Sequence, residues 1–110
     1  MSKKLEERTR AEISPENLGH YEVLIDNETT RITFHRIEPG QQSGWHRHEH
    51  DYVGYHLQDS EVHVDREDGK NVVMTSQVGV ANFYEGGFEH NVSVKGDSAL
   101  VALEIEYKKA

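Results

Sequence analysis

Apolar and polar residues alternate along the chain from Tyr21 almost to its end, which is the pattern of β-strands with one buried face. Turn-forming residues, among them Pro39-Gly40, Asp68-Gly69 and Gly86-Gly87, interrupt the alternation about every ten residues. We predict about eight or nine short strands, within residues 21–25, 29–37, 52–57, 60–67, 71–76, 78–84, 89–94 and 99–107. Short strands at this spacing are typical of an antiparallel sandwich or barrel, so the predicted fold class is all-β.

The N-terminal segment follows a different pattern. Residues 3–12 are rich in helix-forming and charged residues, with only Leu5 and Ala11 apolar, and Pro15 and Gly19 then break the pattern. We predict a short helix or an arm over residues 1–20 and a single β-barrel domain over residues 21–110.

Three histidines stand at alternate positions in the segment GWHRHEHDY, residues 44–52. Residues i and i+2 of a strand share a face, so His46 and His48 can reach one metal ion, whereas a bend would remove His50. Two ligands bind a metal weakly, and His90 is the best candidate for a third because it follows a glycine turn and begins another strand. The alternative is that His46 and His48 form a solvated polar strand edge.

Composition and charge exclude several classes of partner. The chain has 110 residues, with 20 acidic and 12 basic residues and a net charge of −8, which argues against nucleic acid and against an anionic membrane surface. The absence of cysteine removes disulfide scaffolds and thiolate sites. Because no segment reads as a signal peptide or a membrane span, we expect a cytoplasmic protein.

Two segments resemble the sequence motifs of the cupin family. In PGQQSGWHRHEHDYVGYHLQD, Gly40, His46 and His48 match the glycine and the His-x-His pair of the first motif. In GVANFYEGGFEHNVSV, Gly79, Gly87 and His90 match the second motif. The resemblance runs from about residue 21 to residue 107, and it is nearest to small single-domain bacterial cupins, some of which are linked to β-alanine degradation.

The resemblance implies an antiparallel barrel of the jelly-roll type with His46, His48 and His90 as ligands of a divalent transition metal (Zn, Fe, Ni, Mn or Cu). The glutamate of the first motif is replaced here by Tyr52, so the resemblance implies no carboxylate ligand. Tyr52 is either a hydrogen-bond donor beside the metal or a packed barrel tyrosine. His56 shares the inward phase and is a fourth ligand, a proton carrier, or a histidine bonded to backbone.

Three functions remain open at this point. The first is a metal-dependent enzyme acting on a small organic metabolite, with Tyr52 or His56 moving a proton. The second is a non-catalytic cupin that binds or senses a small ligand, and the third is a metal-free scaffold for a partner. The fold alone does not separate them. We also expect a homodimer, because small barrels leave apolar sheet faces and edges to be covered.

Overall fold

The protein is described here by a computed structural model covering residues 13–108, and its elements are strands apart from one 3₁₀ turn, η1 (Pro15–Asn17). Of the predicted arm or short helix over residues 1–20, residues 1–12 lie outside the described residues, and residues 13–20 contain η1 and the start of β1. Within residues 13–108 there is no helix long and apolar enough to cross a membrane. The strands are β1 (His20–Asp26), β2 (Thr30–Ile37), β3 (His46–His48), β4 (Asp51–His56), β5 (Ser60–Arg66), β6 (Asn71–Ser76), β7 (Ala81–Tyr84), β8 (Phe88–Val94) and β9 (Leu100–Tyr107).

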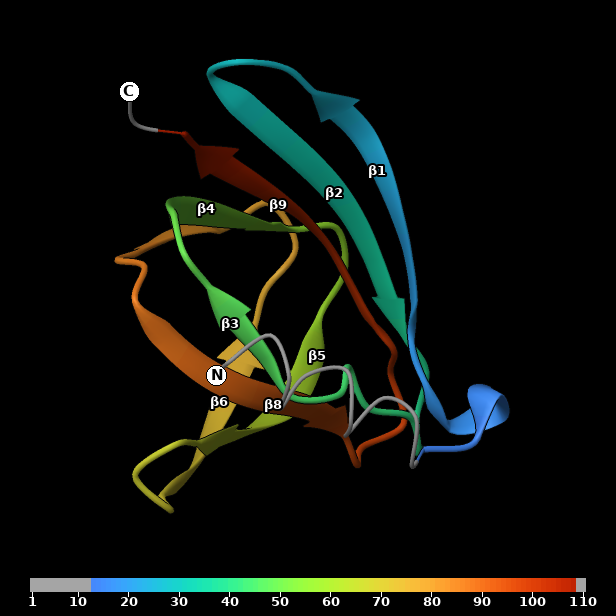
Figure 1. The fold of residues 1–110 in the computed structure, drawn as a ribbon. Coiled ribbons are helices and arrows are strands. Elements are labelled where there is room, and N and C mark those ends of the chain that lie inside the picture. The colour runs from blue at the N-terminus through green and yellow to red at the C-terminus, as the bar shows by residue number, and fades with distance from the viewer. Residues whose placement is uncertain (1–12, 109–110) are drawn as a thin grey trace.

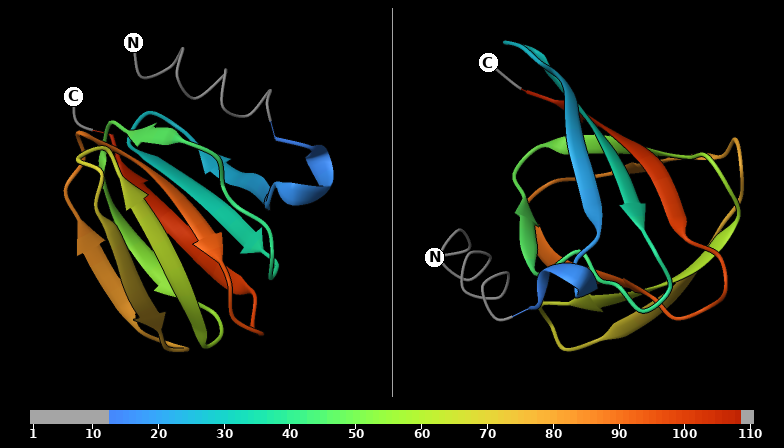
Figure 2. Two further views of the ribbon diagram at one scale, coloured as in Figure 1. Left: turned by 90° about the horizontal axis from the view of Figure 1, so that it is seen from below. Right: turned by 90° about the vertical axis from the view of Figure 1, so that its right-hand side faces the viewer.

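The strands form two antiparallel sheets that face each other around a barrel. The larger sheet has the order β1-β2-β9-β4-β7, and the smaller has the order β3-β8-β5-β6. Figure 1 shows β2, β9 and β4 along one side of the barrel and β8, β5 and β6 along the other, and Figure 2 shows the two sheets from two further sides. Sequence neighbours such as β3 and β4 lie in different sheets. Two facing antiparallel sheets with this strand order confirm the predicted all-β jelly roll.

The segment after Trp45 is two strands rather than one. β3 belongs to the smaller sheet and β4 to the larger, and the chain turns between them at Glu49 and His50. The backbone of Gly86 packs against this corner: a Cβ atom there would lie 2.7 Å from the carbonyl carbon of His50. Only glycine fits without a shift, since real Cβ atoms do not approach backbone that closely. This contact therefore places the β7–β8 connection directly against the β3–β4 connection.

Alternation divides each strand between the inside and the outside of the barrel. On β5, Val62 and Val64 are 5% and 8% exposed, whereas Glu61 lies at the surface. The apolar core comprises six inward residues, Ile37, Val62, Val64, Val94, Leu100 and Ala102, with Met74 and Val92 packed against them. We call this set of eight the apolar end of the barrel. In the β5–β8 register, Val62 and Val64 pair with Val94 and Val92, away from the pair formed by Arg66 and His90.

Candidate metal centre

The three predicted histidines meet on one face of the smaller sheet. Antiparallel pairing of β3 with β8 places His46 directly opposite His90 and His48 opposite Phe88. Because paired residues and residues at i and i+2 share a face, all three imidazoles point into the barrel. His48 and His90 are 5% and 9% exposed, and His46 is half-buried. The solvated strand edge is therefore excluded for His48.

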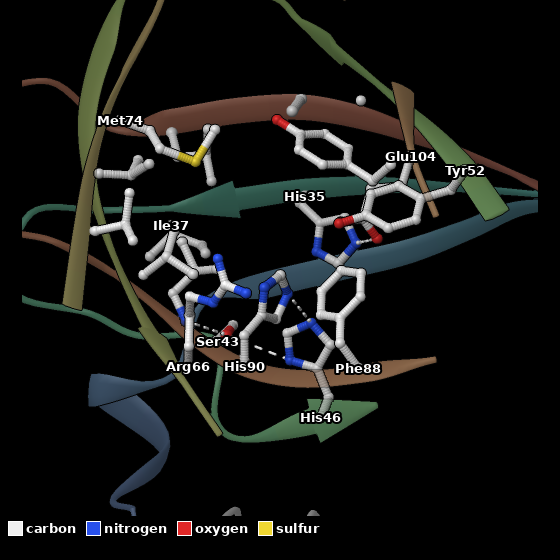
Figure 3. Close-up of a pocket in the computed structure, with 18 of the residues that line it drawn as sticks. His35, Ile37, Ser43, His46, Tyr52, Arg66, Met74, Phe88, His90 and Glu104 are labelled. Atoms are coloured by element: carbon white, nitrogen blue, oxygen red, sulfur yellow. Dashed lines mark hydrogen bonds and ion pairs between the residues drawn. The ribbon is translucent and has the colours of Figure 1, made fainter. Parts of the chain in front are cut away.

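The three imidazoles converge through their Nε2 atoms. The distances are 2.9 Å between His46 and His48, 3.0 Å between His48 and His90, and 3.0 Å between His90 and His46. Figure 3 shows His46 and His90 turned toward each other at the wall of a cavity. Each separation is shorter than two metal–nitrogen bonds of about 2.0–2.1 Å, so one ion can contact all three nitrogens.

The hydrogen-bonding chemistry of these contacts points to a cation. A neutral imidazole nitrogen carries either a hydrogen or a lone pair. In a triangle of three nitrogens at least one contact must join two hydrogens or two lone pairs, so no arrangement of protons satisfies all three contacts. In addition, Nδ1 of His46 donates to the carbonyl oxygen of Gly44 at 2.9 Å, which leaves the lone pair of the neutral ring on Nε2. Three lone pairs around one cation would remove the conflict, so the residues fit a metal ion.

Burial keeps the two inner imidazoles neutral. It lowers the pKa of His48 to about 4, with His46 adding to the effect and Glu104 opposing it. Burial also lowers the pKa of His90 to about 2, and the neighbouring His46 and His48 act in the same direction. Imidazole must be neutral to bind a metal, so both rings are ready to act as ligands at neutral pH.

Glu104 supplies a carboxylate beside the histidines. Its Oε1 accepts a hydrogen bond from Nε2 of His35 at 3.0 Å, and its Oε2 lies 4.0 Å from Nε2 of His48. Burial alone would raise the pKa of Glu104, but the hydrogen bond from His35 and the nearby imidazoles hold that pKa at about 2. We call His46, His48, His90 and Glu104 the histidine end of the barrel.

Sequence reasoning missed both Glu104 and His35. The alternation over residues 99–107 indicates an inward apolar face that includes Leu103. In the structure the face that lines the cavity instead carries Leu100, Ala102 and Glu104. The available signal was that two acidic residues, Glu104 and Glu106, continue the phase of Leu100 and Ala102, since a strand face that continues a buried row seldom carries an unpaired charge.

Tyr52 occupies the position of the family's glutamate and packs on the site. It is 4% exposed, its ring stacks on His48 with a centroid distance of 4.2 Å, and its other neighbours are Tyr84 and Phe88. Burial and the nearby Glu104 raise the pKa of Tyr52, so the phenol stays protonated. Tyr52 therefore fixes the plane of the His48 ring and presents a neutral hydroxyl.

His56 and His50 lie apart from the three-histidine cluster. His56 is four residues after Tyr52 on β4, which corresponds to about 13 Å along a strand. It is 9% exposed and lines the cavity, burial lowers its pKa, and its buried Nδ1 has no hydrogen-bond partner within residues 13–108. His50 is half-buried at the β3–β4 corner, where the chain bends.

His46 and His90 form part of the wall of a cavity of about 520 Å³ inside the barrel. Its walls are mostly apolar, including Val62, Met74 and Leu100, while His46, His90 and Glu104 line its polar part. A second, polar pocket of about 180 Å³ is also lined by His46, His48 and Glu104 and is bounded by Arg31 and Arg47. Cavities of several hundred Å³ with few polar groups are typical of small-molecule sites.

Comparisons with known proteins identify the class. No family model matches the chain. It is 34% identical over 87 residues to the β-alanine degradation protein BauB of Pseudomonas aeruginosa, an alignment that spans 78% of this chain and 90% of BauB. It is 35% identical to the crystal structure of a cupin domain from Bordetella pertussis Tohama I, with a TM-score of 0.79 and coverage of 84% and 95% of the two chains.

A more distant structure shares the fold. A protein with a double-stranded β-helix domain from Klebsiella pneumoniae is 16% identical, with a TM-score of 0.68 over 91% of this chain and 86% of that one. The sequence relationships and the barrel together place the chain in the cupin family, as a small cupin domain that carries a three-histidine cluster able to hold a metal ion.

Proposed function

We propose that this cupin binds one divalent transition-metal ion (Zn, Fe, Ni, Mn or Cu) through His46, His48 and His90, and acts as an enzyme on a small organic metabolite in the barrel cavity. The observation that carries the proposal is the convergence of three Nε2 atoms, with His46 and His90 in the wall of a cavity of about 520 Å³. A metal bound there would supply a positive charge that polarises an oxygen of the substrate.

The residues around the cavity suggest the kind of substrate. The apolar walls exclude water and hold a carbon skeleton, which strengthens electrostatic interactions at the histidine end. Arg66 pairs with His90 in the β5–β8 register and also lines the cavity, where Figure 3 shows its guanidinium group near His90. This arrangement supports an organic acid whose carboxylate faces Arg66. The relationship to BauB makes β-amino acids and the keto acids related to them the first compounds to test.

The Tyr52 hydroxyl and the His56 imidazole are the candidate proton-handling groups. Tyr52 is stacked on His48, and its phenol is protonated, so it can donate a proton or a hydrogen bond beside the metal. His56 lies farther along the cavity with a lowered pKa, so it is neutral and able to accept a proton from the distal part of a substrate.

The metal site is tested by elemental analysis of protein purified without an affinity tag. His46→Ala is expected to lose the metal, because it removes one of three ligands, and His50→Ala is the matched control in the same segment. Full metal occupancy in His46→Ala would rule out the ligand set. Incubation of the metal-loaded protein with β-amino acids, keto acids and thiols under oxygen then tests turnover.

A non-catalytic binding or sensing cupin is the second candidate. It is favoured by the mostly apolar lining of the cavity, which suits retention of a ligand more than proton transfer. Binding of one of the tested compounds to the metal-loaded protein, with no product by mass spectrometry, would select this alternative.

We also propose that the protein is a homodimer. The outward face of the larger sheet carries rows of apolar residues, of which Tyr55, Phe83 and Tyr107 are 37%, 60% and 45% exposed. A second copy can cover this face by self-complementary packing. Light scattering is expected to give twice the chain mass, and Phe83→Glu is expected to shift the protein to a monomer; a wild-type monomer at micromolar concentration contradicts the proposal.

A further inference from the structure

The first cupin motif of this chain lacks its glutamate, yet a carboxylate reaches the same site from another strand. Tyr52 fills the expected position on β4 and packs as a flat ring against His48. Among the described residues four carboxylates line the cavity: Glu67 and Asp68 are exposed and Glu89 is half-buried. The fourth, Glu104 on β9, lies 4.0 Å from His48.

The backbone register explains why Glu104 can reach the histidines. Glu104 is paired with Gly54 on β4 and with Thr33 on β2. Because Gly54 has no side chain, the inner surface beside Glu104 is open toward the cavity between Tyr52 and His56. Figure 3 shows the carboxylate of Glu104 next to His35 and Tyr52.

The two oxygens of Glu104 have different surroundings. Oε1 accepts the hydrogen bond from His35 at 3.0 Å, and this bond fixes the carboxylate. Oε2 is then left on the side of His48, at 4.0 Å from Nε2. A carboxylate oxygen and an imidazole nitrogen that bind the same ion at neighbouring positions lie about 3 Å apart. At 4.0 Å from His48, Glu104 is therefore placed outside the ligand set, at a separation that a water molecule or a substrate atom bridges.

The charges favour a cation at this position. The side chain of Glu104 is 21% exposed, and its two oxygens face His35 and His48. A buried carboxylate costs free energy unless it is paired. Among the described residues its hydrogen-bond partner is His35, and His48 lies 4.0 Å away, so a divalent cation held by the three imidazoles would supply a countercharge.

We propose that Glu104 is the carboxylate of the metal centre, acting from β9 in place of the glutamate missing from β4. It stabilises the bound ion by its charge and accepts a hydrogen bond from the water or substrate group next to the ion. This inference rests on the proposed metal site, but it concerns a residue outside both sequence motifs.

The test is titration of the metal-free protein with Co²⁺ alone. Binding is measured by calorimetry and by the visible absorption bands of the bound ion. E104Q keeps the size of the side chain and removes its charge. We expect its affinity for Co²⁺ to fall by about tenfold to hundredfold and the absorption bands to shift, because loss of a partner behind the ligands has effects of this size. Thermal unfolding of the metal-free proteins checks the fold.

The matched control is E106Q on the same strand. Glu106 is two residues further along β9 on the same face, is half-buried, and lies opposite Tyr52 in the register, but unlike Glu104 it does not line the cavity of about 520 Å³, and Arg31 is nearby. We expect less than about a threefold change in Co²⁺ affinity for E106Q, since charges near the surface are screened. Wild-type affinity in E104Q, or an equal loss in both variants, overturns the proposal.

Two further variants separate the possible failures. His46→Ala is expected to lose Co²⁺ binding whether or not Glu104 takes part, so binding by His46→Ala refutes the three-histidine site itself. If E104Q does not fold, E104D retains the charge on a shorter side chain. It is expected to bind Co²⁺ more weakly than the wild type, by about threefold to tenfold. Unchanged affinity in E104D then counts against Glu104.

Discussion

The histidine end and the apolar end of the barrel are built by the same strands but depend on different interactions. β8 carries His90 near its start and Val94 at its end, and β9 begins at Leu100 and carries Glu104 four residues later. At the apolar end Val94 is 1% exposed and packs in the core, whereas at the histidine end three nitrogens meet in contacts that no arrangement of protons satisfies. Stability and chemistry are therefore separated along the strands rather than between them.

The separation has a physical reason. Apolar packing is non-directional and favours neighbours of almost any shape, so it stabilises the fold wherever inward residues are apolar. Convergent imidazoles need fixed directions, which β3 and β8 supply through their antiparallel register. A variant at the apolar end should then leave metal affinity almost unchanged, and a variant at the histidine end should leave the free energy of unfolding of the metal-free protein almost unchanged.

The largest effect is expected for His90→Ala on metal affinity. Removing one of three ligands should weaken binding of Co²⁺ or Zn²⁺ by about a hundredfold or more, because the remaining pair holds the ion only weakly. Metal-free stability should change by less than about 1 kcal/mol, since His90 contributes little apolar burial. Calorimetric titration and thermal unfolding measure the two quantities.

The control for this prediction is His63→Ala. His63 lies in the same sheet, on β5, between the inward residues Val62 and Val64, and so it points away from the cavity. It should bind metal like the wild type. A comparable loss in both variants would mean that histidine removal acts through the fold.

Val94→Ala makes the opposite prediction at the apolar end. Its side chain is the most deeply buried of the core, and loss of two methyl groups should reduce the free energy of unfolding by about 2 kcal/mol. The affinity of the folded protein for metal should remain within about twofold of the wild type. Urea unfolding and calorimetry give both values, and a large loss of affinity would show that the two ends are coupled.

Acid should destabilise the metal-free protein through the histidine end. The pKa of His48 is about 4 in the fold against 6.5 for the free group, and that of His90 is about 2. The unfolded chain therefore binds more protons below pH 6.5, so this stability is present above that pH and is lost as the pH falls through 4 and below. The loss should be on the order of 1 to 3 kcal/mol between pH 6.5 and 4.

His48→Gln sharpens the pH experiment. It removes one of the titrating imidazoles, so unfolding free energies measured from pH 6.5 to 4 should fall less steeply than in the wild type. Equal slopes would mean that other groups, such as the exposed acids, dominate the acid response.

The fold was predictable from sequence because period-two alternation and glycine turns report local geometry. The strands around Val62, Val64 and Val94 were located in this way, and the structure confirms them. The division after Trp45 was not predictable in detail. It depends on the contact between Gly86 and the backbone of His50, which joins residues far apart in sequence.

The candidate site was predictable only where it follows the motifs. His46 and His48 are neighbours on one strand, and His90 follows a glycine turn and matches the second motif. Glu104 could not be placed, because its position depends on the register of β9 against β2 and β4 and on its hydrogen bond with His35. Pairing between distant strands decides which row of an alternating strand faces the cavity.

The smallest effect is expected for Tyr52→Phe, which asks whether the residue that replaces the motif's glutamate acts through its ring or its hydroxyl. The ring stacks on His48 at 4.2 Å and on Tyr84 at 5.1 Å, and phenylalanine keeps both contacts. Metal affinity should stay within about twofold and unfolding free energy within about 1 kcal/mol of the wild type, since at most one hydrogen bond is lost. Calorimetry and thermal unfolding test both values. If Tyr52→Phe instead weakens Co²⁺ binding as much as E104Q does, the phenol oxygen belongs to the metal centre, and the carboxylate on β9 is not the only substitute for the missing glutamate.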